Sequence, residues 1–458
     1  MLTNDTVLND WTPEDPAKWQ SRQAWLTLWI TTFSLILGFM VWYMVSVLAP
    51  MLQNAQVVGK SQAFWLTAMP GLAGGLLRLV WMFLPPMIGT RRMVFWSTIA
   101  LMAPMAGWMW LLTMPLDVLK GAFGWMMFLA FLTGLGGGIF SGYMPSTSYF
   151  FPKKKQGVAL GLQAGIGNFG VSVVQLLTPI LVGVGVFGAA KAIPKTKHPD
   201  ATFLQTAPAF ILALLVVAAV LVFVFIKSVP VKANFRQQID IFSNKHTWLM
   251  TLIYLLTFGC FSGLAGTFAL MLNNMVPHVP TIAWLGGTTI AFLGAFIGSA
   301  SRVLWGPLCD RFGGGVWTVV SSLGIAASSV LVIVALNGAK LLTDVPAGQA
   351  AKCEVPLGLF LAGMLSLFFF AGIGNAATFK QMPMIFPPRQ AGGVIGWTAA
   401  IAAFGPFIFS LTMNALSGGS GNFGQKIIPV FIAVAALAVV CAVVAWWFYA
   451  RPGAEAKS

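Results

Sequence analysis

Charged side chains are scarce in this sequence: they make up 8% of the 458 residues, whereas hydrophobic residues make up 58%. With a mean hydropathy of +0.84, this composition excludes a soluble globular protein. The four cysteines are scattered without a Cys-x-x-Cys spacing, so the sequence predicts neither a disulfide framework nor a metal site. The three histidines lie in or near predicted loops, and the lack of a histidine pair inside a span excludes a haem-binding membrane subunit. We expect no cofactor and no enzymatic reaction.

Long apolar segments account for most of the chain. They are about twenty residues long and recur between short polar breaks, which is the pattern of membrane-spanning helices. A backbone that faces lipid must satisfy its own hydrogen bonds, so we expect these segments to be helical. The sequence therefore predicts an all-α integral membrane protein with twelve transmembrane helices, at residues 25–49, 62–84, 93–113, 122–146, 157–185, 207–229, 248–276, 281–308, 315–337, 355–383, 392–415 and 427–450.

Acidic residues are scarcer than basic ones: the chain has 11 aspartates and glutamates but 26 lysines and arginines. No acidic residue lies in the middle of a predicted span. Arg78 and Arg302 do lie within apolar segments, and both occur in the pattern Gly-x-x-x-Arg-x-x-Trp. A guanidinium at bilayer depth costs at least about 2.5–3.5 kcal/mol, and it cannot lose its proton to avoid that cost. A buried ion pair would explain them structurally, but the spans contain no carboxylate for it. We therefore expect Arg78 and Arg302 to bind a flat oxyanion, which suits the guanidinium fork.

The formal net charge of +15 could indicate nucleic-acid binding, but the placement of the basic residues indicates membrane topology instead. If both termini are cytoplasmic, the basic clusters at 91–92, 153–155 and 227–245 lie on the cytoplasmic side, as the positive-inside rule requires. The lysines between 191 and 197 are an exception. We expect a multi-pass protein with both termini in the cytoplasm and no nucleic-acid partner.

The two halves of the sequence resemble each other. Residues 151–170 align without gaps on residues 386–405, at an offset close to half the chain. Six helices, a basic segment and six related helices form the plan of a major facilitator transporter, whose binding site lies between the halves. We therefore expect a major facilitator fold with two pseudo-symmetric six-helix bundles, at 1–229 and 248–458, joined by a cytoplasmic linker at 230–247.

The end of the eighth span carries a second motif of that superfamily. Asp310 and Arg311 lie in a segment that resembles its Gly-x-x-x-Asp-Arg-x-Gly loop. We expect these two residues to brace a cytoplasmic gate through charge pairs and helix-end dipoles. The alternative is a solvated turn whose charges contribute only to topology.

Glycines and one amide share the fifth span. Gly165 and Gly167 belong to a glycine-rich run at 157–170, which leaves one helix face bare. A bare face permits close helix packing, and it also lets a planar ion stack against backbone. Asn168 lies within this run, and an amide at membrane depth needs partners. We expect Asn168 to hydrogen-bond either the anion or a facing backbone group.

Three aromatic residues and one lysine complete the candidate site. Tyr254 and Phe258 are one helical turn apart and share a face, so with Phe140 they could sandwich a flat substrate while Tyr254 donates its hydroxyl. They could equally fill the core. Lys380 is either a third anion contact, or a proton carrier if burial lowers its pKa, or a side chain that extends to the membrane surface.

The ionisable residues also indicate how transport is driven. Proton-coupled carriers commonly relay protons through Asp, Glu or His within the membrane, and the predicted spans offer none at their centres. Two facing guanidiniums should resist closing unless an anion neutralises them. The sequence therefore favours the exchange of one anion for another. An anion channel is the alternative. Counterflow of labelled nitrate would distinguish them, because a channel shows no stimulation by anion on the opposite side.

The motif-bearing segments at 161–179, 150–153 and 10–16 resemble the signatures of the nitrate/nitrite porter (NarK-type) family of the major facilitator superfamily. The resemblance spans nearly the whole chain. It implies a carrier of nitrate and nitrite in the bacterial cytoplasmic (inner) membrane. We also expect a monomer and a role in nitrate assimilation. The resemblance also implies that the family's substrate-binding residues fall on Arg78, Arg302, Asn168, Tyr254, Phe140 and Phe258.

This sequence departs from the family pattern in two places. The repeat in the second half has alanines at 399, 402 and 403 where more glycine is expected, so helix packing there should be looser. The short loop at 387–390, together with Lys380, resembles the branch associated with proton-coupled nitrate uptake. Nitrate/nitrite antiport is our main prediction, and nitrate:proton symport is the alternative, with protons as a further partner.

Overall fold

The computed structural model describes residues 7–8, 11–183, 193–195, 198–230, 240–275, 287–341, 353–418 and 421–458. Within these residues, twelve helical stretches are long and apolar enough to cross a membrane. They match the twelve predicted spans, with bounds that differ by a few residues, and so confirm the predicted all-α membrane fold. The first part of the predicted eighth span (281–286) and most of the predicted linker (231–239) lie outside the described residues.

The first half of the chain contributes six spans. They are α1 (Ser21–Asn54), α2 (Lys60–Trp81), α4 (Thr90–Leu111), the consecutive segments α6 (Phe123–Thr133), α7 (Leu135–Gly138) and α8 (Phe140–Ser148), α9 (Lys153–Leu181) and α10 (Thr206–Phe225). Short helices and one antiparallel pair of strands occur between them: α3 (Leu84–Ile88), α5 (Leu116–Gly121), β1 (Ile193–Lys195) and β2 (His198–Thr202).

The second half also contributes six spans. They are the continuous run of α12 (Lys245–Tyr254), η3 (Leu255–Gly259) and α13 (Cys260–Met275), then η4 (Gly287–Ala291) with α14 (Phe292–Phe312), α15 (Gly314–Asn337), α16 (Leu357–Ile385), α17 (Pro388–Ala402) with α18 (Gly405–Leu416), and α19 (Phe423–Lys426) with α20 (Ile428–Ala445) and η5 (Trp446–Ala450). The remaining elements are η2 (Asp240–Ser243) and the paired strands β3 (Lys340–Leu341) and β4 (Cys353–Glu354).

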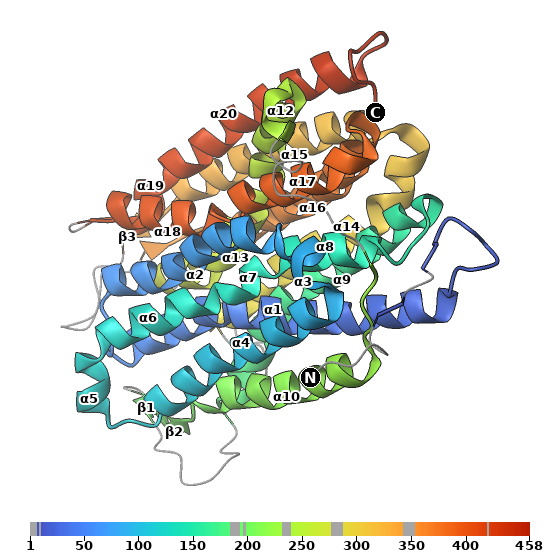
Figure 1. Cartoon of the computed structure of the whole chain (residues 1–458). Helices are drawn as coiled ribbons and strands as arrows, with labels where there is room; N and C mark the ends of the chain where they lie inside the picture. The colour runs from blue at the N-terminus through green and yellow to red at the C-terminus, as the bar shows by residue number, and fades with distance from the viewer. Residues whose placement is uncertain are drawn as a thin grey trace.

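Figure 1 shows the helices of the first half, coloured blue to green, gathered beside those of the second half, coloured yellow to red. Helices α1 and α13 are buried along almost their whole length, whereas α10 and α20 expose apolar side chains such as Val220 and Val443. Hydrocarbon chains are as apolar as these side chains, so the outer helices are suited to face lipid. The inner helices therefore surround the part of the molecule where a polar site can be held away from lipid.

Two irregular stretches shape the middle of the spans. Glycines interrupt the fourth span, and a Cβ on Gly137 would lie 2.5 Å from the Trp42 ring, so α7 approaches α1 closely only because it lacks side chains there. In the seventh span, η3 is a π-helical turn that directly follows Tyr254 and contains Phe258. Such turns often occur at functional sites because they turn side chains out of the regular helical register.

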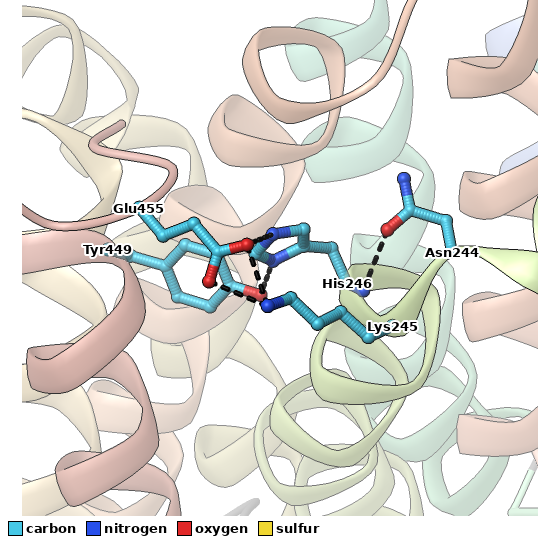
Figure 2. Close-up of polar contacts among 5 residues, drawn as sticks. All are labelled: Asn244, Lys245, His246, Tyr449 and Glu455. Atoms are coloured by element: carbon cyan, nitrogen blue, oxygen red, sulfur yellow. Dashed lines mark hydrogen bonds and ion pairs between the residues drawn. The ribbon is translucent and has the colours of Figure 1, made fainter.

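A polar cluster joins the beginning of α12 to the chain after α20 (Figure 2). Asn244 caps α12 by accepting a hydrogen bond from the backbone N–H of His246, whose Nδ1 lies 3.1 Å from the Tyr449 hydroxyl. The Nζ of Lys245 lies 2.7 Å from the Glu455 carboxylate and, by donating to it, holds the pKa of that carboxyl below its usual range. The carboxylate therefore stays charged at neutral pH, and the contact holds the seventh span against the twelfth.

The two halves are bonded together at the end of the molecule that lies away from this cluster. Gln53 donates to Asn274 over 3.1 Å, and Asn54 donates to Asn273 over 2.9 Å, which joins the end of α1 to the end of α13. These side chains explain why α1 extends beyond the predicted apolar segment. Deeper in the same end, the hydroxyls of Thr67 (α2) and Ser410 (α18) lie 2.5 Å apart.

The halves diverge toward the end that carries the cluster. Helices α9 and α14 touch where a Cβ on Gly165 would lie 2.5 Å from Val303, but one turn earlier a Cβ on Gly161 would meet nothing within 4 Å. Likewise, Gly396 of α17 approaches Met82, whereas a Cβ on Gly392 would meet nothing within 4 Å. The fold is therefore closed across the halves at one end and more open at the other.

Candidate functional site

Arg78 lies in the last turn of α2 and Arg302 in the middle of α14, and both are buried, with exposed fractions of 0% and 4%. The Nε of Arg78 donates to the carbonyl of Gly137 over 2.8 Å, and its Nη1 donates to the carbonyl of Ala399 over 2.7 Å. Its Nη2 has no hydrogen-bond partner among the described residues, and neither has either Nη of Arg302. Three charged donor groups are thus left free in the interior of the protein.

No carboxylate of the described residues forms an ion pair with either guanidinium. The two charges are also close enough to repel each other. A buried cation without a counter-ion is strongly unfavourable, and the arrangement therefore calls for a negative charge from outside the protein. The sequence prediction that no acid would neutralise these arginines agrees with the described ion pairs.

Aromatic rings connect the two arginines. The Arg78 guanidinium lies 4.7 Å from the Phe140 ring centre, 5.1 Å from that of Phe258 and 5.1 Å from that of Trp42. The Arg302 guanidinium lies 4.6 Å from the ring centre of Phe379, which itself contacts the Phe140 ring at 6.1 Å. Each guanidinium is held by the negative face of a ring, which offsets part of the cost of its burial.

The rings of Tyr254 and Phe258 stack with 4° between their planes and 5.4 Å between their centres. Phe140 continues the stack, with its ring 6.4 Å from Phe258 at an interplanar angle of 22°. The π-helical turn keeps Tyr254 and Phe258 on one face despite the change of helical register. The structure therefore brings together the three predicted aromatic residues beside the arginines, as a wall suited to a flat ligand.

Two further predicted residues have unsatisfied polar atoms. Asn168 on α9 is fully buried, and both its amide oxygen and its amide nitrogen lack partners among the described residues. The Tyr254 hydroxyl makes no hydrogen bond of ordinary length either, although it lies beside the Arg302 guanidinium. Buried polar groups are nearly always satisfied, so a group of such atoms around two unpaired charges indicates a ligand.

The predicted glycines play different parts. Gly165 lies against Val303, the neighbour of Arg302, where α9 of the first half meets α14 of the second. Gly167 instead lies against Leu35 of α1, so it serves packing within the first half. Asn168 is about one turn from Gly165 on α9, so it lies near the helix face that meets α14.

Sequence reasoning missed Trp42 and Phe379 as members of this region. Trp42 donates its indole N–H to the carbonyl of Pro70 over 2.8 Å and lies under Arg78. Phe379 stands directly before Lys380, and its position relative to Arg302 depends on how α16 crosses α14.

The structure places Lys380 away from the arginines. Its Nζ forms an ion pair with the carboxylate of Asp310 near the ends of α16 and α14, and both side chains are partly exposed. Of the alternatives open at the sequence level, this position matches a side chain that extends to the membrane surface. Arg311, the other predicted gate residue, lies with its guanidinium 5.2 Å from the ring centre of Phe312, outside the site.

The Lys380–Asp310 pair leads to a first testable prediction. Partly exposed ion pairs contribute about 0–1 kcal/mol, so Lys380→Gln and Asp310→Asn should each change transport less than about fivefold. The double variant should be no worse than the more affected single variant, because the two residues act as one pair. Initial transport rates of the four proteins in liposomes, at several external pH values, provide the measurement. If Lys380→Gln alone abolishes transport or its pH response, Lys380 acts beyond the pair.

The family model of the Major Facilitator Superfamily matches residues 31–344. A "Probable nitrate/nitrite antiporter NarK2" of Thermus thermophilus is 46% identical over 457 residues, covering 98% of each chain. The "Nitrate/nitrite transporter NarU" of Escherichia coli (strain K12) is 30% identical, covering 97% of this chain and 96% of that one.

Solved structures agree in fold. A crystal structure of a D-xylose–proton symporter aligns with a TM-score of 0.66 at 15% identity, covering 95% of this chain and 99% of that one. A bacterial homologue of the human lysosomal transporter Spinster, in an inward-facing and unoccupied conformation, aligns with a TM-score of 0.63 at 14% identity, covering 93% and 97%. The chain therefore belongs to the major facilitator superfamily and, within it, to the nitrate/nitrite porter family of NarK and NarU.

Proposed function

We propose that this protein exchanges nitrate for nitrite across the bacterial cytoplasmic (inner) membrane by alternating access. The observation that carries the proposal is the pair of buried guanidiniums, one from each half, with three free Nη groups and no carboxylate partner among the described residues. The names of its full-length relatives, which are nitrate/nitrite transporters, supply the identity of the anion.

The chemistry of the site suits a small planar oxyanion. Arg78 and Arg302 donate to the oxygens from the two halves, and Asn168 and Tyr254 add neutral donors. The stacked rings of Phe140 and Phe258 offer a flat wall for such an ion, and Gly165 lets the two halves approach closely beside Arg302. A tetrahedral anion such as sulfate would fit against this wall poorly, because it is neither flat nor singly charged.

Exchange follows from the charges. The two guanidiniums repel each other when the site is empty, so closing the halves around an empty site is unfavourable. Nitrate and nitrite each carry one negative charge and relieve that repulsion equally, so either ion permits the change of state. In nitrate:proton symport, Lys380 would have to carry a proton from its pair with Asp310, which lies outside the site.

The two bundles and the termini can also be assigned to positions relative to the membrane. We assign the bundles to residues 1–229 and 248–458 and the linker to 230–247, with a monomer as the working unit. Both termini are assigned to the cytoplasm, on the strength of the basic clusters. The end closed by Gln53 and Asn274 is then periplasmic, and the structure represents an inward-facing state. Asp310 and Arg311 then belong to the cytoplasmic gate.

Counterflow in liposomes provides the test. Vesicles with purified protein and nitrite inside should take up labelled nitrate at least about tenfold faster than vesicles without internal anion, because only loaded carriers change state. A pH gradient alone should not drive uptake into nitrite-free vesicles. Equal uptake with and without internal nitrite would contradict exchange and indicate a channel. Uptake that requires a proton gradient would indicate symport.

A further inference from the structure

Asn375 lies in the middle of α16 and is fully buried. Its amide oxygen and its amide nitrogen both lack a hydrogen-bond partner among the described residues. A buried amide in a native protein is normally satisfied, since leaving it unpaired is destabilising. The position therefore needs an explanation, and neither helix capping nor a neighbouring side chain supplies one.

Helix geometry indicates the direction of this side chain. Asn375 and Phe379 are four residues apart and share a face of α16. The ring of Phe379 lies 4.6 Å from the Arg302 guanidinium and 5.3 Å from the Tyr254 ring. Asn375 is therefore one turn from a residue that lines the site.

The neighbouring glycines define the same direction. Gly372, three residues before Asn375, lies directly against Ser301 and Gly298 of α14, so that a Cβ there would collide with both. Ser301 is the neighbour of Arg302. Gly374, which points about 100° away, lies instead against Ser321 and Thr257. Asn375 therefore lies between the contact with α14 and the aromatic rings, on the side of Arg302.

The two halves then present matching groups. The first half offers Arg78 and Asn168, and the second half offers Arg302 and Asn375. All four are buried, and each has at least one polar atom without a partner among the described residues. Each half thus contributes a buried arginine without a carboxylate and a buried amide without a partner, which is the arrangement that one shared anionic ligand would satisfy.

We propose that Asn375 is a ligand of the transported anion and donates its amide N–H to one of the anion's oxygens. The inference rests on the proposed exchange of nitrate and nitrite at this site. A neutral donor suits the position, because it adds a hydrogen bond without adding a third positive charge to the repulsion between the arginines. With Asn168, it gives the anion one amide contact from each half.

The first test is Asn375→Ala in liposomes loaded with nitrite. Loss of a hydrogen bond to a charged ligand should raise the KM for nitrate about 10- to 100-fold. Gln381→Leu is the matched control: it removes another buried amide of α16, but one whose Nε2 already donates to the Thr318 hydroxyl of α15. Its KM should stay within about twofold of that of the wild type.

The second test is Asn375→Asp, which preserves shape but introduces a carboxylate. Beside Arg302, this carboxylate would pair with the guanidinium and replace the anion, so the protein should melt no lower than the wild type in nitrate-free buffer. Nitrate should no longer raise its melting temperature, whereas it should raise that of the wild type. A merely structural role for Asn375 would not produce this combination.

The outcomes separate the two proposals. If the wild type shows no counterflow, the proposed function fails. If the wild type exchanges but Asn375→Ala keeps its KM, only the role of Asn375 fails. A large fall in the melting temperature of Asn375→Asp without nitrate would also overturn that role, because it would mean an unpaired buried carboxylate away from Arg302.

Discussion

Replacing Arg302 with lysine is expected to lower nitrate exchange by at least about a hundredfold. Lysine keeps the positive charge but loses the planar fork, so it cannot donate from two positions at once. Both Nη groups of Arg302 are free for a ligand, and each hydrogen bond to a charged group contributes about 1.5–3 kcal/mol. Counterflow of labelled nitrate in liposomes, with KM and maximal rate determined separately, is the measurement.

Arg78→Lys should be at least as damaging, for an additional reason. Arg78 also donates to the carbonyls of Gly137 in its own half and Ala399 in the other half, so its loss removes a connection between the halves as well as a ligand. Arg451→Lys is the matched control, since Arg451 donates to the carbonyl of Trp447 at the end of the last span. Near-normal exchange by either site variant would refute the arginine clamp, whatever the control does.

The sequence predicted the spans well because their cause is local. A segment such as α10 is apolar along its whole length, and the lipid requires it to be helical whatever its neighbours do. The same logic identified Arg78 and Arg302: a charge inside such a segment is costly, and the shortage of acids is visible in composition alone. These predictions needed no knowledge of how the helices cross.

The parts that could not be predicted depend on crossing and register. Phe379 and Lys380 are adjacent in sequence, but one lies at Arg302 and the other pairs with Asp310. Which of them faces the site is decided by how α16 rotates against α14, where Gly372 permits close contact. The π-helical turn at Leu255–Gly259 likewise has no signature in an apolar run. Long-range packing, rather than residue type, determines these features.

The close contact between α9 and α14 leads to a further prediction. In this state, a Cβ on Gly165 would lie 2.5 Å from Val303, beside Arg302, where the two halves meet. Gly165→Val should therefore push α9 away from α14 and lower nitrate exchange by at least about tenfold, since overpacking at a tight contact costs about 1–3 kcal/mol.

Gly124→Val is the matched control for Gly165→Val, because a Cβ on Gly124 would meet nothing within 4 Å. It should leave exchange within about twofold of the wild type. The exchange rate and the melting temperature with and without nitrate should be measured for both variants. Gly165→Val should lose most of the nitrate-induced stabilisation, since separating α9 from α14 draws Asn168 away from Arg302. Full exchange by Gly165→Val would mean that the halves do not need this contact.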